Sequence, residues 1–219
     1  MELNVLNVIL IVVISYLIGS FPTAYFVAKS RRINIFAVGS GNMGGTNVAR
    51  SLGFWWGILT ALIDILKGVI AVLIAQWIMP DKQWTAITIS SISVIIGHNW
   101  SLFASLLYAA VNHSPFSFRG GKGAATAFGT LLVIAPPLIP IIMVTIGGVI
   151  VLITRYVSLG VLVAFGLAVI GLLYMVGNNF LPPEVLVYTL VLSFLILHRF
   201  RDNIKRLVLG QERKLGERI

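Results

Sequence analysis

A glycine-rich segment at residues 39–50, GSGNMGGTNVAR, carries the residue types that bind anions. Glycines let main-chain N–H groups approach an anion closely, and an arginine completes a bidentate contact with a phosphate. A flexible connector is the alternative, but connectors rarely need hydroxyl, amide and guanidinium groups together. We therefore predict a phosphate-binding loop. Its candidate ligands are Gly39, Ser40, Gly41, Asn42, Thr46, Asn47 and Arg50.

A second glycine-rich segment, FRGGKGAAT at residues 118–126, offers the same chemistry. Its glycines expose main-chain amides, and its lysine adds a positive charge. A helix expected from about Ala124 would also direct the positive end of its dipole at a bound anion. We predict a second anion cradle here, made by Gly120, Gly121, Lys122 and Gly123.

Three ionisable residues fall within or at the ends of apolar runs. Asp64 and Lys67 are three residues apart on one helical face, a spacing at which they can pair. Charged groups in a membrane span are costly and usually face the protein interior, so a structural ion pair is favoured over direct catalysis, and a supporting role beside a site stays open. His98, at the end of a run, fits a general base or a phosphate donor as well as an ordinary hydrogen-bonded histidine.

The elements that position these residues must lie in a membrane. Of the 219 residues, 58% are hydrophobic and 11% are charged, and the mean hydropathy is +0.98. A water-soluble domain has about 25% charged residues. The lack of cysteine excludes disulfide scaffolds, thiol nucleophiles and thiolate metal sites, and three distant histidines do not suggest zinc. The net charge of +9 then indicates anionic lipid or phosphorylated substrates rather than nucleic acid.

Apolar runs predict an all-α integral membrane protein, a single domain over residues 1–219 with about seven transmembrane helices. The clearest runs are residues 3–28, 54–79 and 156–176, and shorter ones are residues 84–96, 124–135, 138–153 and 185–197. With seven alternating spans, fourteen of the 16 Lys and Arg residues fall on one side. Positive loops stay in the cytoplasm, so we expect the N-terminus outside, the C-terminus inside and both glycine-rich loops at the cytoplasmic face.

The basic segment 199–219 is predicted to be a cytoplasmic tail lying on anionic lipid. Asn203 and Glu212 are unexpected in such a tail, because neither strengthens attraction to anionic lipid.

Together, these segments resemble the acyl-phosphate:glycerol-3-phosphate acyltransferase family, integral membrane enzymes that begin phospholipid synthesis in many bacteria. Three motifs carry the resemblance in the same order at one membrane face. They are GSGNMGGTNVAR at 39–50, GHNW with FRGGKGAAT within 97–126, and RDNIKRL with a following glutamate within 201–212.

The resemblance implies transfer of a fatty acyl group from acyl phosphate to the 1-hydroxyl of glycerol 3-phosphate, without metal or cofactor. The products are lysophosphatidic acid and phosphate. The resemblance also implies that the protein lies in the bacterial cytoplasmic membrane. A soluble enzyme that makes acyl phosphate is a candidate partner. The implied catalytic residues are Ser40, His98, Lys122 and Asn203, and Glu212 joins the substrate-binding groups of the two loops. The attacking hydroxyl is expected to lose its proton to the donor phosphate.

The chain also departs from the family pattern. Met43 and Ser101 stand where members usually have proline, and Arg119 stands where they have lysine. Residues 104–115 look like an insertion of about a dozen residues, a length at which a loop usually has its own role. Because residues 101–111 are mostly apolar, we predict an extra helical turn or two at the membrane interface.

Two other functions remain as alternatives. A transporter of a phosphorylated metabolite also uses glycine breaks and buried charge, but its polar groups lie near the membrane midplane between inverted repeats. A purely structural membrane protein would explain the basic tail and leave both glycine-rich loops without a role.

Overall fold

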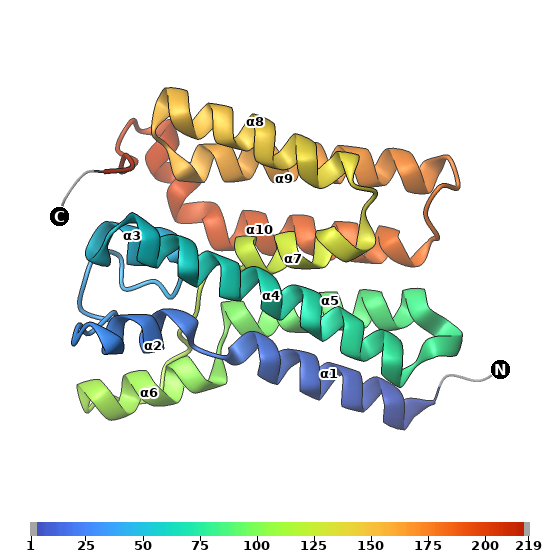
Figure 1. Cartoon of the computed structure of the whole chain (residues 1–219), viewed down its shortest axis with the longest axis horizontal. Helices are drawn as coiled ribbons and strands as arrows, with labels where there is room; N and C mark the ends of the chain where they lie inside the picture. The colour runs from blue at the N-terminus through green and yellow to red at the C-terminus, as the bar shows by residue number, and fades with distance from the viewer. Residues whose placement is uncertain (1–3, 217–219) are drawn as a thin grey trace. The chain divides into compact units, whose positions relative to one another are not determined.

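Every regular element within residues 4–216, the part of the chain that the computed structural model describes, is a helix. This confirms the all-helical class. Three segments are long and apolar enough to cross a membrane, Val5–Ser30, Phe54–Ile78 and Val157–Gly177, and they coincide with the three clearest predicted runs. The predicted start at residue 3 and the tail residues 217–219 lie outside the described residues. The chain divides into two compact units, one ending at Thr130 and one beginning at Leu131 (Figure 1).

The first span of the first unit is a broken helix. Helix α1 (Val5–Ser20) and helix α2 (Thr23–Ser30) are separated at Phe21 and Pro22. Proline has no N–H and fixes its own φ, so it interrupts the hydrogen-bond ladder of a helix. The run that the sequence predicts as one continuous span is therefore two helices with an irregular junction.

A second broken helix packs against the first. Helix α5 (Gln83–Asn99) ends at Trp100, and helix α6 (Leu102–Asn112) begins after Ser101, whose hydroxyl accepts a hydrogen bond from the Ala104 N–H. Helix α6 covers most of the inserted segment and confirms that this segment is helical. At the α1–α5 contact a Cβ at Gly97 would lie 2.2 Å from the Tyr16 carbonyl oxygen, so the close approach of the two backbones requires glycine there.

Helix α4 (Phe54–Ile78) forms the second span and packs against α1 and α5. Two of its tryptophans, Trp55 and Trp77, are 77% and 84% exposed. They are 22 residues apart, which at 1.5 Å per residue is about 33 Å. Exposed tryptophans gather at the two interfaces of a bilayer whose hydrocarbon core is about 30 Å thick, so Trp55 and Trp77 mark the two ends of the span.

Three shorter helices complete the elements around the site. Helix α3 (Gly45–Leu52) follows the first glycine-rich loop and packs on α4, and the turn η1 (Pro80–Lys82) joins α4 to α5. Helix α7 (Ala124–Ile134) follows the second glycine-rich loop. Its start agrees with the predicted start at Ala124.

The second unit contains three long helices, α8 (Leu138–Thr154), α9 (Val157–Gly177) and α10 (Glu184–Val208). Helices α8 and α9 form a hairpin in which Gly147 and Gly160 face each other across the contact. Helix α10 packs on α9. Of the predicted shorter spans, 138–153 and 185–197 thus correspond to well-formed helices.

Candidate functional site

The first glycine-rich loop is held by the side chain of Asn47. Its Oδ1 accepts hydrogen bonds from the main-chain N–H of Ser40 at 2.9 Å and from the Ser40 hydroxyl at 3.2 Å. Its amide nitrogen donates to the Val38 carbonyl oxygen at 3.3 Å. Asn47 is buried and Ser40 is exposed, so the predicted ligand Asn47 orients the Ser40 hydroxyl rather than facing open solvent.

Helix α3 carries the remaining candidates of this loop. Thr46 lies in its first turn and Arg50 in its last turn. The helix is pressed against α4, since a Cβ at Gly45 would lie 2.7 Å from the Gly57 carbonyl oxygen. This close backbone contact fixes the position from which the Arg50 side chain extends. Gly39, Gly41 and Asn42 lie in the preceding turn, where both glycines have positive φ.

The second glycine-rich loop folds over the end of helix α5. The Ser101 N–H donates to the Arg119 carbonyl oxygen at 2.8 Å, and the Gly121 N–H donates to the His98 carbonyl oxygen at 3.0 Å. The Met43 N–H donates to the Gly120 carbonyl oxygen at 3.4 Å. The last contact joins the two loops, so segments that are far apart in the chain form one cluster.

Two glycines of this loop lie directly on side chains of α5. A Cβ at Gly121 would be 2.0 Å from His98 Nε2, and one at Gly123 would be 2.6 Å from Asn99 Oδ1. The His98 imidazole therefore lies against Gly121, the residue that directly precedes Lys122. Asn99 belongs to the GHNW motif without a predicted role, and it is buried with both side-chain polar atoms unpaired in the described structure.

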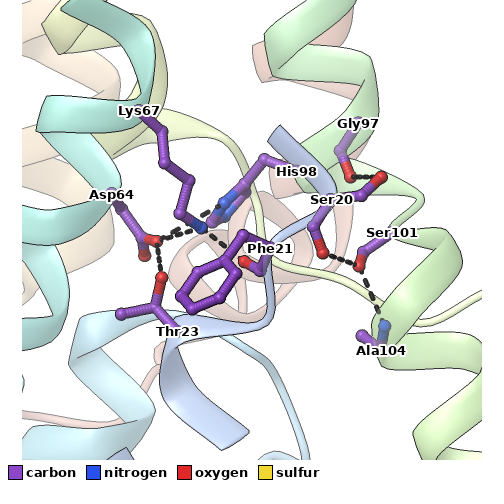
Figure 2. A network of polar contacts seen from close by, with 9 residues as sticks. All are labelled: Ser20, Phe21, Thr23, Asp64, Lys67, Gly97, His98, Ser101 and Ala104. Atoms are coloured by element: carbon purple, nitrogen blue, oxygen red, sulfur yellow. Dashed lines mark hydrogen bonds and ion pairs between the residues drawn. The ribbon is translucent and has the colours of Figure 1, made fainter. Parts of the chain in front are cut away.

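Figure 2 shows a buried polar network that includes His98, the residue on which Gly121 of this loop lies. Lys67 Nζ is 2.6 Å from Asp64 Oδ1, which confirms the predicted pairing of the two residues. The Thr23 hydroxyl donates to the same carboxylate oxygen at 2.8 Å, and Lys67 also donates to the Phe21 carbonyl oxygen at 2.6 Å. His98 Nδ1 lies 3.9 Å from Asp64 Oδ1.

This network explains why α4 carries two charges inside a span. Asp64 lies nine residues beyond Trp55, about 13 Å inside that interface. An isolated charge there would be costly, and the network supplies it with partners. Lys67 also adds a charged donor to the Phe21 carbonyl oxygen at the break, which accepts from the Thr23 N–H as well. Thr23 and Phe21 were not identified from the sequence as partners of the two charges. A proline at position 22 within an apolar run is the feature that could have indicated a helix break there.

The predicted residues Asn203 and Glu212 meet in the second unit. The Asn203 amide donates to Glu212 Oε1 at 2.7 Å, the Ser158 hydroxyl to the same oxygen at 3.0 Å, and Arg206 Nε to Oε2 at 2.8 Å. Burial alone would raise the pKa of Glu212, but the hydrogen bonds from Asn203, Arg206 and Ser158 and the Arg206 charge lower it below its usual 4.5. No pattern in the sequence singled out Ser158.

The Glu212 carboxylate thus fastens the tail back onto α9 and α10. Arg155 strengthens this attachment, since its guanidinium donates to the Leu215 carbonyl oxygen at 2.7 Å. Within residues 4–216 no group of three or more His, Cys, Asp or Glu side chains is placed to hold a metal ion.

Comparisons with known proteins agree with this arrangement. The glycerol-3-phosphate acyltransferase family model matches residues 9–210. The chain is 38% identical over 211 residues to the glycerol-3-phosphate acyltransferase of Thermoanaerobacter pseudethanolicus, with 96% of each chain covered. It is 37% identical over 206 residues to the enzyme of the same name from a strain of Thermus thermophilus, with 94% of each covered.

Two solved structures are similar to the chain over nearly its whole length. They are the glycerol 3-phosphate form and the lysophosphatidic acid form of PlsY (YgiH), an integral membrane glycerol 3-phosphate acyltransferase. The first has a TM-score of 0.79 at 32% identity and covers 95% of this chain and 96% of that chain. The second has a TM-score of 0.78 at 32% identity and covers 95% of each. The chain therefore belongs to the glycerol-3-phosphate acyltransferase family of integral membrane enzymes.

Proposed function

We propose that this protein transfers a fatty acyl group from acyl phosphate to the 1-hydroxyl of glycerol 3-phosphate, giving lysophosphatidic acid and phosphate. The observation that carries the proposal is the contact between the two glycine-rich loops at Met43 and Gly120. Each loop brings its own cation, Arg50 in one and Lys122 in the other. Two adjacent cationic loops fit a reaction with two phosphorylated substrates.

The chemistry needs positioning more than a strong base. The 1-hydroxyl oxygen of glycerol 3-phosphate attacks the acyl carbonyl carbon, and the bond from that carbon to the phosphate oxygen breaks. The hydroxyl proton passes to the departing phosphate, so atoms and charge balance without another reactant. Lys122 and Arg50 would stabilise the negative charge that develops on the two phosphates, and the Ser40 hydroxyl held by Asn47 would orient one of them.

His98 fits a positioning role in this scheme. Its ring lies between Asp64 and Gly121, so it supports the loop that carries Lys122. Asn203 and Glu212, which bind each other, would hold the tail beside α9.

We also propose the membrane arrangement that the charge distribution favours. The chain would cross the bacterial cytoplasmic membrane about seven times as a single domain, with the N-terminus outside and both loops facing the cytoplasm. In this orientation the site would accept glycerol 3-phosphate from the cytoplasm and acyl phosphate from a soluble enzyme or from the membrane.

The test is acyl transfer by purified protein in a lipid mesophase. Phosphate release from palmitoyl phosphate is followed with glycerol 3-phosphate present or omitted, and palmitoyl-CoA then replaces the acyl phosphate. We expect release that depends on glycerol 3-phosphate, does not occur with the CoA ester, and falls at least about 100-fold in Ser40→Ala and Lys122→Ala.

A matched control is Lys82→Ala, which removes a lysine from the turn between α4 and α5 and should leave turnover unchanged. Absence of release from well-folded protein would contradict the proposal and make transport of a phosphorylated metabolite the better explanation. Equally fast acyl transfer from palmitoyl-CoA would contradict acyl phosphate as the donor and leave the rest of the proposal standing.

A further inference from the structure

Helix α6 presents an apolar face that nothing in its unit covers. Residues 103, 106, 107, 110 and 111 follow the spacing of one helical face, and all of them are apolar. Phe103, Leu106 and Val111 on this face are exposed, Leu106 by 51%. The opposite side faces the protein, where Ala104 and Ser105 are buried. A helix facing water would carry polar groups on its outer side, so this face is built for an apolar solvent.

The depth of α6 follows from its neighbours in the same unit. At its start, the Ser101 hydroxyl donates to the carbonyl oxygen of Ser20, the last residue of α1. At its end, the Asn34 amide approaches Asn112 Oδ1 at 3.5 Å, beyond the end of α2. Helices α2 and α6 lie side by side (Figure 1), and Ala104 belongs to the same buried cluster as Ala24 and Val27.

Helix α2 is the last part of the candidate span Val5–Ser30. A helix that runs beside α2 from one end to the other occupies the same depth in the bilayer. Helix α6 has 11 residues, about 16 Å, which is half of a hydrocarbon core about 30 Å thick.

Charge and aromatic residues place the membrane boundary at the far end of α6. Residues 102–118 contain no Asp, Glu, Lys or Arg. The exposed basic residue Lys29 lies in the last turn of α2, and the exposed Arg31 and Arg32 follow directly after the helix. Phe116 and Phe118 follow α6, are exposed and pack edge to face with centroids 5.2 Å apart. Basic and aromatic side chains are typical of the headgroup region.

The chain after α6 returns to Ser101, and the protein pairs its backbone at the end of this return. The Arg119 carbonyl oxygen accepts from the Ser101 N–H, and the Arg119 N–H donates to the Ser105 hydroxyl at 2.9 Å. The Gly121 N–H donates to the His98 carbonyl oxygen. Irregular backbone is tolerated at membrane depth only when the protein itself satisfies it, and the inner end of the segment, at Arg119 and Gly121, meets that condition.

From these observations we propose that residues 101–121 form a re-entrant hairpin. Helix α6 enters the bilayer to half its depth, and its outer face at Phe103, Leu106 and Ala110 contacts the acyl chains of the leaflet at which α2 ends. The segment that looks like an insertion is then a membrane-embedded element that leads into the second glycine-rich loop.

The test uses the natural absence of cysteine in this chain. Single cysteines replace Phe103, Leu106, Ala110 or His113, and each carries a nitroxide spin label in the full-length protein reconstituted into phosphatidylcholine–phosphatidylglycerol liposomes. Collision rates with oxygen and with a water-soluble nickel complex report depth. Leu62→Cys, on an exposed face of the α4 span, is the lipid reference, and Asp81→Cys in the turn after α4 is the aqueous reference.

We expect depth to decrease in the order 103, 106 and 110, with the label at 113 in the headgroup region. Equal depth along the helix would overturn the proposal in favour of a helix lying flat on the membrane. Nickel access at all positions would mean a face open to water, and shelter from both oxygen and nickel would mean a protein partner or a second copy; either result would also overturn it. Unchanged thermal midpoints confirm that the labelled variants are folded, so the test does not depend on enzymatic activity.

Discussion

The Lys67 ammonium lies 2.6 Å from the main-chain oxygen of Phe21, where Pro22 breaks the first span. The same ammonium is 2.6 Å from the Asp64 carboxylate. One buried charge on α4 therefore stabilises both a buried carboxylate and the broken end of α1. Breaks in membrane helices persist only when such partners satisfy the freed backbone groups.

Replacement of Lys67 by methionine should therefore destabilise the protein severely. The Asp64 carboxylate would lose its cationic partner and keep the Thr23 hydroxyl, and the Phe21 carbonyl would lose the ammonium and keep the Thr23 N–H. Breaking a buried pair typically costs about 3–5 kcal/mol. The measurement is chemical unfolding in mixed micelles. The double variant Asp64→Asn, Lys67→Met should recover part of the loss, and an additive loss would contradict the pairing. Thr60→Ala is the matched control, because the Thr60 hydroxyl donates only to its own helix at Trp56.

Asn47 should act on turnover through Ser40. Asn47→Ala removes the acceptor that holds both the N–H and the hydroxyl of Ser40, so the loop loses its fixed geometry. We expect kcat to fall roughly 10- to 100-fold, since small misplacements of a positioning group have effects of that size. Asn47→Asp keeps the acceptor oxygen and should lose less. Equal losses in both variants would show that the bond to Val38, not the hold on Ser40, is decisive.

Gly121→Ala should disturb the second loop because the new methyl group would overlap the His98 ring at 2.0 Å. We expect a loss of turnover of about tenfold or more, with a lower thermal midpoint, as for other overpacked sites. The double variant Gly121→Ala, His98→Ala tests the contact, because it should regain thermal stability relative to the sum of the two single changes. Gly148→Ala, at a helical glycine with open space around it, should be neutral or slightly stabilising.

The Glu212 attachment should weaken in acid. A carboxylate whose pKa is lower in the folded than in the unfolded protein contributes stability above its unfolded pKa, and that contribution disappears as the pH falls through the folded pKa. The pKa of Glu212 lies below its usual 4.5, so the loss occurs below that pH. Thermal midpoints of the unmodified protein and of Glu212→Gln should therefore differ most near about pH 7 and converge as the pH falls below 4.5.

The exposed carboxylate of Asp202 provides the control for this pH experiment. Asp202 lies in α10 next to Asn203, and Asp202→Asn should give no pH-dependent difference. A Glu212→Gln protein as stable as the unmodified one at neutral pH would contradict the attachment of the tail through Glu212.

Part of this protein can be derived from its sequence because local chemistry decides it. Hydropathy locates the three long spans, since a helix of about 20 apolar residues matches the thickness of the hydrocarbon core of a bilayer. The spacing of Asp64 and Lys67 predicts their pairing, because residues three apart share one face of a helix. The glycine-rich motifs locate both loops, and the helix after the second begins at Ala124 as expected.

The tertiary structure decided what depends on contacts between distant segments. Residue spacing carries no information on the bond from Lys67 to Phe21, 46 positions apart, or on the ring of His98 under Gly121. The sequence predicts Asn47 as a ligand, which stays a prediction, and only the tertiary structure shows that its buried amide oxygen accepts from Ser40. The sequence predicts an extra helical turn or two in the inserted segment, and only the tertiary structure shows its contacts with Ser20 and Asn34. Helix periodicity is local, whereas depth and partners are set by packing.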